Sequence, residues 1–147
     1  FVITDMESST LLAETNPALF REILEIHDAL VRQLVDEYSG YEVMSQGDSF
    51  ELAFVEPSLA VCFCNALQTR LMKHEWDKRV LGLSGCEEMY DEHERLVYRG
   101  PRVRVGLAYG TEAFRKPLVS GRADYFGALP NLAARIMSQA EGGQLLL

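Results

Sequence analysis

Apolar residues recur along this chain with two different periods, and the period predicts which segments are helices and which are strands. From Pro17 to near Ser39, apolar side chains recur every three or four positions, and Asn16-Pro17 is a typical helix start. A second run of this kind begins at Pro57 and a third at Pro130, before a double glycine. Runs rich in β-branched and aromatic residues predict strands instead, at 1–4, 41–46, 48–54 and 102–110.

The order of these elements predicts the fold class. Strand, helix, two strands and helix are followed by a charged segment at 73–100, then by a strand, a loop at 111–123, a helix and a strand. This order fits a sheet that contains antiparallel strands and carries its helices on one face, so we expect an α+β fold, a ferredoxin-like α/β sandwich. We expect 73–100 to be a surface excursion, a small hairpin whose charged side chains face water.

The composition fits one globular domain. The chain has 147 residues, 48% of them hydrophobic and 24% charged, which is enough for a single core and too few for two. We expect one domain over 1–147. Because the chain starts without Met in one apolar strand and stops in another, we expect it to be part of a larger protein. No apolar run approaches the roughly 20 residues of a membrane helix, so we expect no membrane contact from this domain.

Charge and cysteine content restrict the partners and the compartment. The net charge of −8 argues against a nucleic-acid surface, where Lys and Arg must neutralise phosphates. A small anionic ligand remains compatible with it, because a metal ion can bridge acidic side chains to phosphate. Three cysteines without metal-ligand spacing favour a reduced, cytoplasmic setting, which includes the cytosolic part of a membrane-anchored receptor-type protein.

Two acids sit at the ends of strands that a ferredoxin-like sheet makes neighbours. Asp5 ends the first predicted strand, and Asp48 follows the turn glycine of the hairpin. An acid at a hairpin tip is usually a solvated turn residue, but two carboxylates meeting at one edge form a site of hard ligands suited to Mg²⁺ or Mn²⁺. The polar turn after Asp5, with Ser9 and Thr10, offers N–H groups and hydroxyls to phosphate. The pattern therefore predicts metal-dependent phosphoryl chemistry.

Four blocks of the sequence also resemble a known family. They are "FVITDMESSTLLAETNP", "GYEVMSQGDSFELAF", "VYRGPRVRVGLAYG" and "GRADYFGALPNLAARIMSQAEGGQ". In this order they resemble the class III nucleotide cyclase catalytic domain, above all that of fungal, trypanosomatid and algal adenylyl cyclases. The resemblance is weakest at 73–98. It implies the fold of that domain and an enzyme of intracellular signalling that converts ATP to 3′,5′-cyclic AMP and pyrophosphate.

The resemblance implies a role for residues of the first two blocks. Asp5 and Asp48 match the two metal-binding aspartates, and the Met6 carbonyl matches a further metal ligand. Two ions, Mg²⁺ or Mn²⁺, would be bound in each active site. Ser9 and Thr10 fall in the turn that holds the phosphates.

The later blocks imply the rest of the site. Arg104 matches an arginine that contacts the triphosphate, and Asp124 matches the acid that accepts from the adenine amino group. Asn131 and Arg135 match residues that orient the ribose and stabilise the transition state. A phosphate-binding lysine of the family is expected beyond Leu147.

The resemblance also implies a site shared between two chains. One chain supplies the metal-binding acids, and the other supplies Asp124, Asn131 and Arg135. The active unit would therefore be a homodimer or a heterodimer with a similar domain.

Some positions depart from the family pattern. Met44 stands where adenylyl cyclases carry a base-reading lysine and guanylyl cyclases a glutamate, and Ala108 and Tyr109 replace a usual His-Thr or His-Trp pair. We expect ATP to be preferred through Asp124, with GTP as a weaker substrate. The alternatives are a guanylyl or relaxed-specificity cyclase, a catalytically silent partner domain, and a diguanylate-cyclase-like domain suggested by "QGDSF". The presence of Asp5, Asp48, Asn131 and Arg135 argues against the silent partner, and the diguanylate-cyclase idea does not explain the helix with Asn131 and Arg135.

Overall fold

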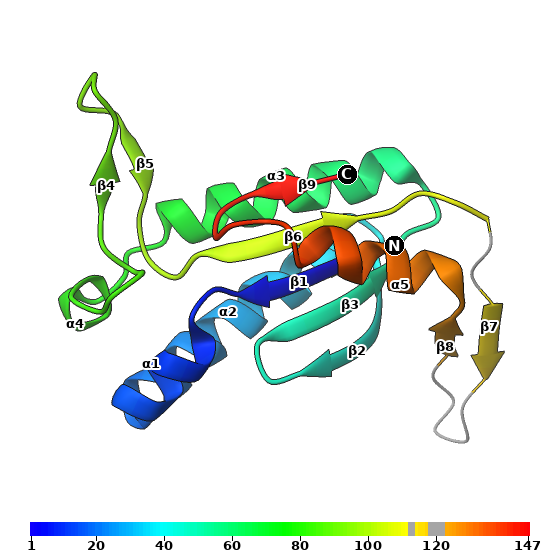
Figure 1. The fold of residues 1–147 in the computed structure, drawn as a ribbon, viewed down its shortest axis with the longest axis horizontal. Coiled ribbons are helices and arrows are strands. Elements are labelled where there is room, and N and C mark those ends of the chain that lie inside the picture. The colour runs from blue at the N-terminus through cyan, green and yellow to red at the C-terminus, as the bar shows by residue number, and fades with distance from the viewer. Residues whose placement is uncertain (112–113, 118–122) are drawn as a thin grey trace.

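A five-stranded sheet forms the centre of the protein, which we describe from a computed structural model covering residues 1–111, 114–117 and 123–147 (Figure 1). The strand order is β2-β3-β1-β6-β9. Neighbouring strands are antiparallel except β6 and β9, which are parallel. The strands are β1 (Val2–Met6), β2 (Tyr41–Gln46), β3 (Ser49–Ala53), β6 (Val103–Leu107) and β9 (Leu145–Leu146). This arrangement confirms the predicted α+β class.

Two long helices cover one face of the sheet. They are α2 (Pro17–Glu37) and α3 (Pro57–Lys73), and the short α1 (Ser9–Thr15) precedes them. The predicted start of α2 is confirmed, because the side chain of Asn16 accepts a hydrogen bond from the Leu19 N–H at 3.2 Å. Both helices pack on alternate residues of the strands, including Val2, Phe50 and Leu52. Among the described residues, no helix combines the length and apolar character needed to cross a bilayer.

The helix α5 (Ala128–Met137) lies on the opposite face, so the expectation that all helices share one face was wrong (Figure 1). Its Leu129 and Ala133 pack with Ile3 and other residues in a second core cluster. Gly106 allows this contact, because a Cβ atom there would collide with the main chain of Ala133 and Met137. We call this side of the sheet the α5 face.

The ends of α5 also differ from the prediction. The helix begins at Ala128, after Gly127, and not at Pro130. It ends at Met137, before the double glycine at 142–143 is reached, and a turn carries the chain from there to β9. The proline is tolerated because the N–H groups of the first helical turn have no partner within the helix.

The segment 73–100 is only partly the surface excursion that we expected. It contains α4 (Lys78–Leu81) and a hairpin of β4 (Met89–Tyr90) and β5 (Leu96–Tyr98), which projects from the body of the protein (Figure 1). However, Trp76, Val80 and Cys86 are buried in the main core. The Trp76 indole N–H also donates to the Leu71 carbonyl at 2.8 Å. The base of the excursion therefore contributes three buried side chains to the core, whereas its hairpin and the charged residues around α4 face solvent.

Two strands occur within and after the segment predicted as a loop at 111–123. They are β7 (Phe114–Pro117) and β8 (Ala123–Phe126), which pair with each other, so the loop prediction was wrong there; 112–113 and 118–122 lie outside the described residues. The Tyr41 hydroxyl accepts from the Ala123 N–H at 2.7 Å, and the Tyr125 ring packs against those of Phe1 and Tyr41. These contacts hold β8 beside the sheet.

We predict that Gly106→Ala destabilises the protein and displaces α5. The new Cβ would lie 2.7 Å from the Met137 Cα and closer still to two other main-chain atoms, which cannot move without moving the helix. Overpacking of this kind costs about 1–3 kcal/mol of unfolding free energy. The measurement is the midpoint of thermal unfolding by circular dichroism. Gly82→Ala is the control, because its Cβ would meet nothing closer than 3.5 Å; equal midpoints for Gly106→Ala and the wild type would refute the prediction.

Candidate active site

The turn between β2 and β3 places Asp48 against the end of β1. Gln46 pairs with Ser49, so the hairpin loop has two residues, and the first, Gly47, has a φ of +60° that glycine adopts readily. Asp48 Oδ2 accepts a hydrogen bond from the Met6 N–H at 2.7 Å. Ser49 Oγ donates to the Thr4 carbonyl at 2.9 Å. Two side-chain contacts thus fasten the start of β3 to the end of β1.

Asp5 lies on the same strand end and forms an ion pair with Arg104. The two residues are opposite each other in the register of β1 and β6. Asp5 Oδ2 accepts from Arg104 Nε at 2.9 Å and from Nη2 at 2.5 Å, and both side chains are partly exposed on the α5 face. The sequence predicted Asp5 and Asp48 at one edge of the sheet, and β1 and β3 are indeed neighbours.

These two acids present only oxygen atoms at this end of the sheet. Across the described residues, no group of three or more His, Cys, Asp or Glu side chains is arranged to hold a metal ion. The second carboxylate oxygen of Asp5 and that of Asp48 make no hydrogen bond within the described part of the chain. A hard divalent ion fits such oxygens, provided that water or substrate phosphate supplies the remaining ligands.

The predicted phosphate residues lie next to this pair of acids. The helix α1 begins at Ser9, and Ser8 before it has a left-handed backbone with φ 60°. Ser9 and Thr10 therefore stand in the first helical turn, Ser9 partly buried and Thr10 exposed. The polar turn after Asp5 therefore leads directly into the short helix α1.

Asn131 and Arg135 project from α5 into solvent. They are four residues apart, about one helical turn, so they share one side of the helix, and both are exposed. Among the described residues, neither side chain forms a hydrogen bond or ion pair with Asp5 or Asp48. Within one chain, these two groups of predicted site residues remain unconnected.

A third group contains Met44, Asp124 and a residue that the sequence reasoning missed, Glu51. Met44 is 47% exposed and lies opposite Glu51 in the β2–β3 register, while Asp124 lies in β8. Burial and the charge of Asp124 raise the pKa of the partly buried Glu51. Strand alternation places Ser49, Glu51 and Ala53 on one face, but it gave no signal for a site, because charged residues are common on the side of a strand that faces away from the core.

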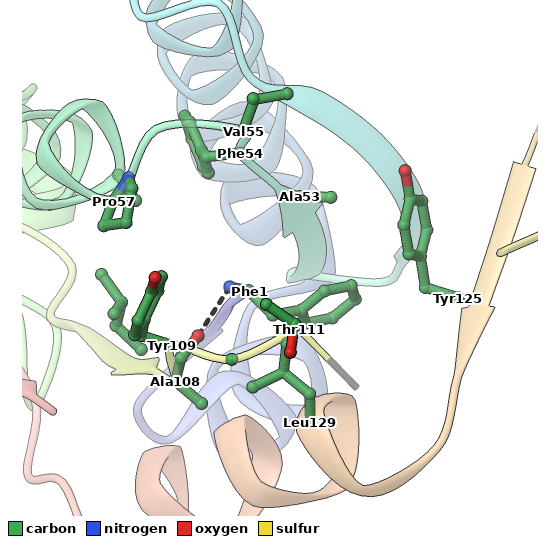
Figure 2. A pocket seen from close by; sticks show the side chains of 13 residues that line it. Phe1, Ala53, Phe54, Val55, Pro57, Ala108, Tyr109, Thr111, Tyr125 and Leu129 are labelled. Atoms are coloured by element: carbon green, nitrogen blue, oxygen red, sulfur yellow. Dashed lines mark hydrogen bonds between the residues drawn. The ribbon is translucent and has the colours of Figure 1, made fainter. Parts of the chain in front are cut away.

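An apolar pocket of about 210 Å³ lies elsewhere, near the start of β1 (Figure 2). Its lining includes Phe1, Pro57, Tyr109, Tyr125 and Leu129, and the Phe1 nitrogen donates to the Ala108 carbonyl at 2.8 Å (Figure 2). None of the residues predicted from the sequence as catalytic, metal-binding or nucleotide-binding lines it. The pocket is therefore separate from the pair of acids.

Comparison of the sequence and fold with known proteins identifies the family of this chain. The sequence profile described as "Adenylate and Guanylate cyclase catalytic domain" matches residues 1–147. An adenylate cyclase of Mycosarcoma maydis is 36% identical over 145 residues, which cover 99% of this chain and 6% of that protein. A receptor-type adenylate cyclase of Trypanosoma brucei brucei is 32% identical over 168 residues, covering 99% of this chain and 13% of the other.

A solved structure agrees with these sequence matches. The structure of a Trypanosoma brucei adenylate cyclase in its monomeric state superimposes with a TM-score of 0.85 at 33% identity, covering 98% of this chain and 68% of that one. Domains of this family bind a nucleotide substrate, depend in general on divalent metal ions and form dimers. From the full-length profile match and from relatives above 30% identity, we conclude that this chain belongs to the family of adenylate and guanylate cyclase catalytic domains, the class III nucleotide cyclases.

Proposed function

We propose that residues 1–147 form the catalytic domain of an adenylyl cyclase, which converts ATP to 3′,5′-cyclic AMP and pyrophosphate in the cytoplasm. The observation that carries the proposal is the pair of carboxylates on neighbouring strand ends, with Asp48 fixed by the Met6 N–H and Asp5 beside it. The full-length relatives named above are adenylate cyclases, although this chain spans only a small part of them. The hairpin of β4 and β5 contributes none of the residues of this proposed site.

Asp5, Asp48 and the Met6 carbonyl would hold two divalent ions, Mg²⁺ or Mn²⁺. When bound, such ions lower the pKa of an attacking hydroxyl and neutralise phosphate oxygens. In the reaction, the ribose 3′-oxygen loses its proton and forms a bond to the α-phosphorus, and the bond from that phosphorus to the β-phosphate oxygen breaks. Pyrophosphate leaves with that electron pair. Ser9 and Thr10 would hold the phosphates from the turn beside Asp5.

Arg104 has two uses in this proposal. Its guanidinium neutralises Asp5 in the absence of ligands, through hydrogen bonds of 2.5 and 2.9 Å. A bound triphosphate would offer it a stronger anion, while the metal ion takes over the neutralisation of Asp5. The side chain is partly exposed, so it is able to turn toward such a ligand.

Asn131 and Arg135 would act on the nucleotide bound by a second chain. Both are exposed on α5, and neither contacts the acids of its own chain through a hydrogen bond or ion pair among the described residues. We therefore propose a homodimer, or a heterodimer with a similar domain, in which each site combines the acids of one chain with α5 of the other. Arg135 would stabilise charge that develops on the α-phosphate in the transition state.

Asp124 would select the purine from the same side as Asn131 and Arg135. Its carboxylate accepts hydrogen bonds, and the amino group of adenine donates them. Met44 offers only apolar contact, so we propose ATP as the preferred substrate and GTP as a weaker one.

The variants Asp5→Asn and Asp48→Asn should each lower cyclic AMP formation by at least roughly 100-fold, because an amide cannot supply the anionic oxygen for a metal ion. The fold should survive, since the amide carbonyl that Asp48→Asn introduces can still accept from the Met6 N–H. The measurement is chromatographic detection of product with ATP and Mn²⁺ or Mg²⁺, together with the unfolding midpoint. Asp36→Asn, on the exposed end of α2, is the matched control. Near-normal turnover by either site variant would disprove the metal assignment.

Mixing two inactive variants should restore activity if the sites are shared. A dimer of one Asp48→Asn chain and one Arg135→Ala chain has one intact site and one site with both defects. At full dimer formation, an equal mixture should recover roughly a quarter of wild-type activity, since half of the dimers are mixed and each has one working site. Activity is measured over a series of protein concentrations, with each variant alone as the control. Absence of rescue at concentrations where sedimentation detects mixed dimers would exclude shared sites.

A further inference from the structure

We propose that Glu51 is a specificity-determining residue, whose neutral carboxyl group donates a hydrogen bond to N1 of adenine while Asp124 accepts from the adenine amino group. The inference rests on the proposed function, which places the purine beside Met44 and Asp124. Met44 has no hydrogen-bond donor in its side chain. The inference assigns this role to Glu51, which is opposite Met44 in the pairing of β2 and β3.

The sheet register brings Glu51 to this place. Glu51 is opposite Met44 on β2 and opposite Ile3 on β1, so all three side chains lie on the α5 face. Phe50 and Leu52, on either side of it, are fully buried against the helices of the other face. Glu51 therefore has to project toward the α5 face. The register shifts between Glu42 and Met44, but Met44 itself is paired with Glu51. Paired residues have Cβ atoms roughly 4.5–5.5 Å apart in a regular ladder, so a ligand that touches Met44 is within reach of Glu51.

The strand β8 is anchored beside the hairpin of β2 and β3. The Ala123 N–H donates to the Tyr41 hydroxyl, which anchors β8 to the strand of Met44. The next residue, Asp124, is close enough for its charge to act on Glu51. Met44 and Glu51 thus lie side by side on the α5 face, and the charge of Asp124 acts on Glu51.

To pair with adenine, one of these two carboxyl groups must accept a hydrogen bond and the other must donate one. Adenine presents an amino donor next to the acceptor N1, so it pairs with one acceptor and one donor. An ionised carboxylate only accepts, whereas a protonated carboxyl group has one O–H donor. Guanine has a proton on N1 and would instead favour an ionised Glu51. In this proposal, the protonation state of Glu51 adds to the selection between adenine and guanine that Asp124 makes.

The surroundings of Glu51 penalise its ionised form. Its partial burial and the charge of Asp124 raise its pKa, while the residues opposite it, Ile3 and Met44, carry no charge. Asp5, two positions along β1, is already paired with Arg104. A purine stacked over Glu51 would remove further water and favour the neutral form again, because desolvation penalises the carboxylate.

The test compares Glu51→Gln with Glu51→Met. Glutamine keeps the shape and an N–H donor, so its kcat/KM for ATP should stay within roughly threefold of wild type, with an unchanged or larger preference for ATP over GTP. Methionine fills the space without a donor and should lower kcat/KM for ATP roughly tenfold and narrow the ATP-to-GTP ratio. Glu25→Gln, on the exposed side of α2, is the matched control and should behave as wild type.

Each contrary outcome overturns the inference in a recognisable way. An unchanged ATP-to-GTP ratio in Glu51→Met would mean that the residue does not face the purine. Equal loss of ATP turnover in both variants, or a wild-type preference for GTP that Glu51→Gln removes, would mean that the ionised form is the functional one.

Equilibrium dialysis separates this inference from the proposed cyclase activity. If neither the wild type nor the variants form a cyclic nucleotide, the cyclase proposal is wrong. The affinities of the same proteins for ATP and GTP then test the role of Glu51. Weaker ATP binding in Glu51→Met, retained in Glu51→Gln, would support the inference. Equal ATP affinity in wild type and both variants would overturn it.

Discussion

The close contact between α5 and β6 at Gly106 determines what the rest of the α5 face can do. Because the glycine has no side chain, the main chain of the helix lies directly on the strand. A helix seated so closely covers the middle of this face through Leu129 and Ala133. It leaves Asp5, Arg104 and Met44 partly exposed on the same face. The opposite face, by contrast, is fully packed against α2 and α3. The polar chemistry of the protein is therefore confined to the side that a single short helix only half covers.

Much of the fold followed from periodicity, and the errors have physical causes. The helix starts at Pro17 and Pro57 and the Gly47 turn were readable because proline and glycine restrict the backbone in specific ways. Period alone does not say on which face of a sheet a helix packs, so α5 was misplaced. The burial of Trp76, Val80 and Cys86 was hidden within a charged stretch, because three apolar anchors among many charges produce no periodic signal.

The candidate site was predictable to different degrees in its three groups. Asp5 and Asp48 could be found from their positions at strand ends, since neighbouring strands bring such ends together. Asn131 and Arg135 were found only through the family resemblance, because an exposed Asn and Arg on a helix are ordinary surface residues. Glu51 escaped both approaches. Its significance depends on which residues lie opposite it in the β2–β3 register and on the pairing of β8, which the sequence did not predict.

The ion pair between Asp5 and Arg104 affects how a cation and an anion would bind at this end of the sheet. With Arg104 in place, the chain carries its own counterion, which lowers the repulsion between acids in a protein of net charge −8. A cation that binds Asp5 would compete with that arginine for the charge of the same carboxylate, and an anion that arrives with it would give the arginine a new partner. By linkage, each of the two ligands then strengthens the binding of the other by the same factor. If a cation and an anion bind together, the cation would neutralise Asp5 and Arg104 would neutralise part of the anion. Neither Asp5 nor Arg104 would then be left without a counterion.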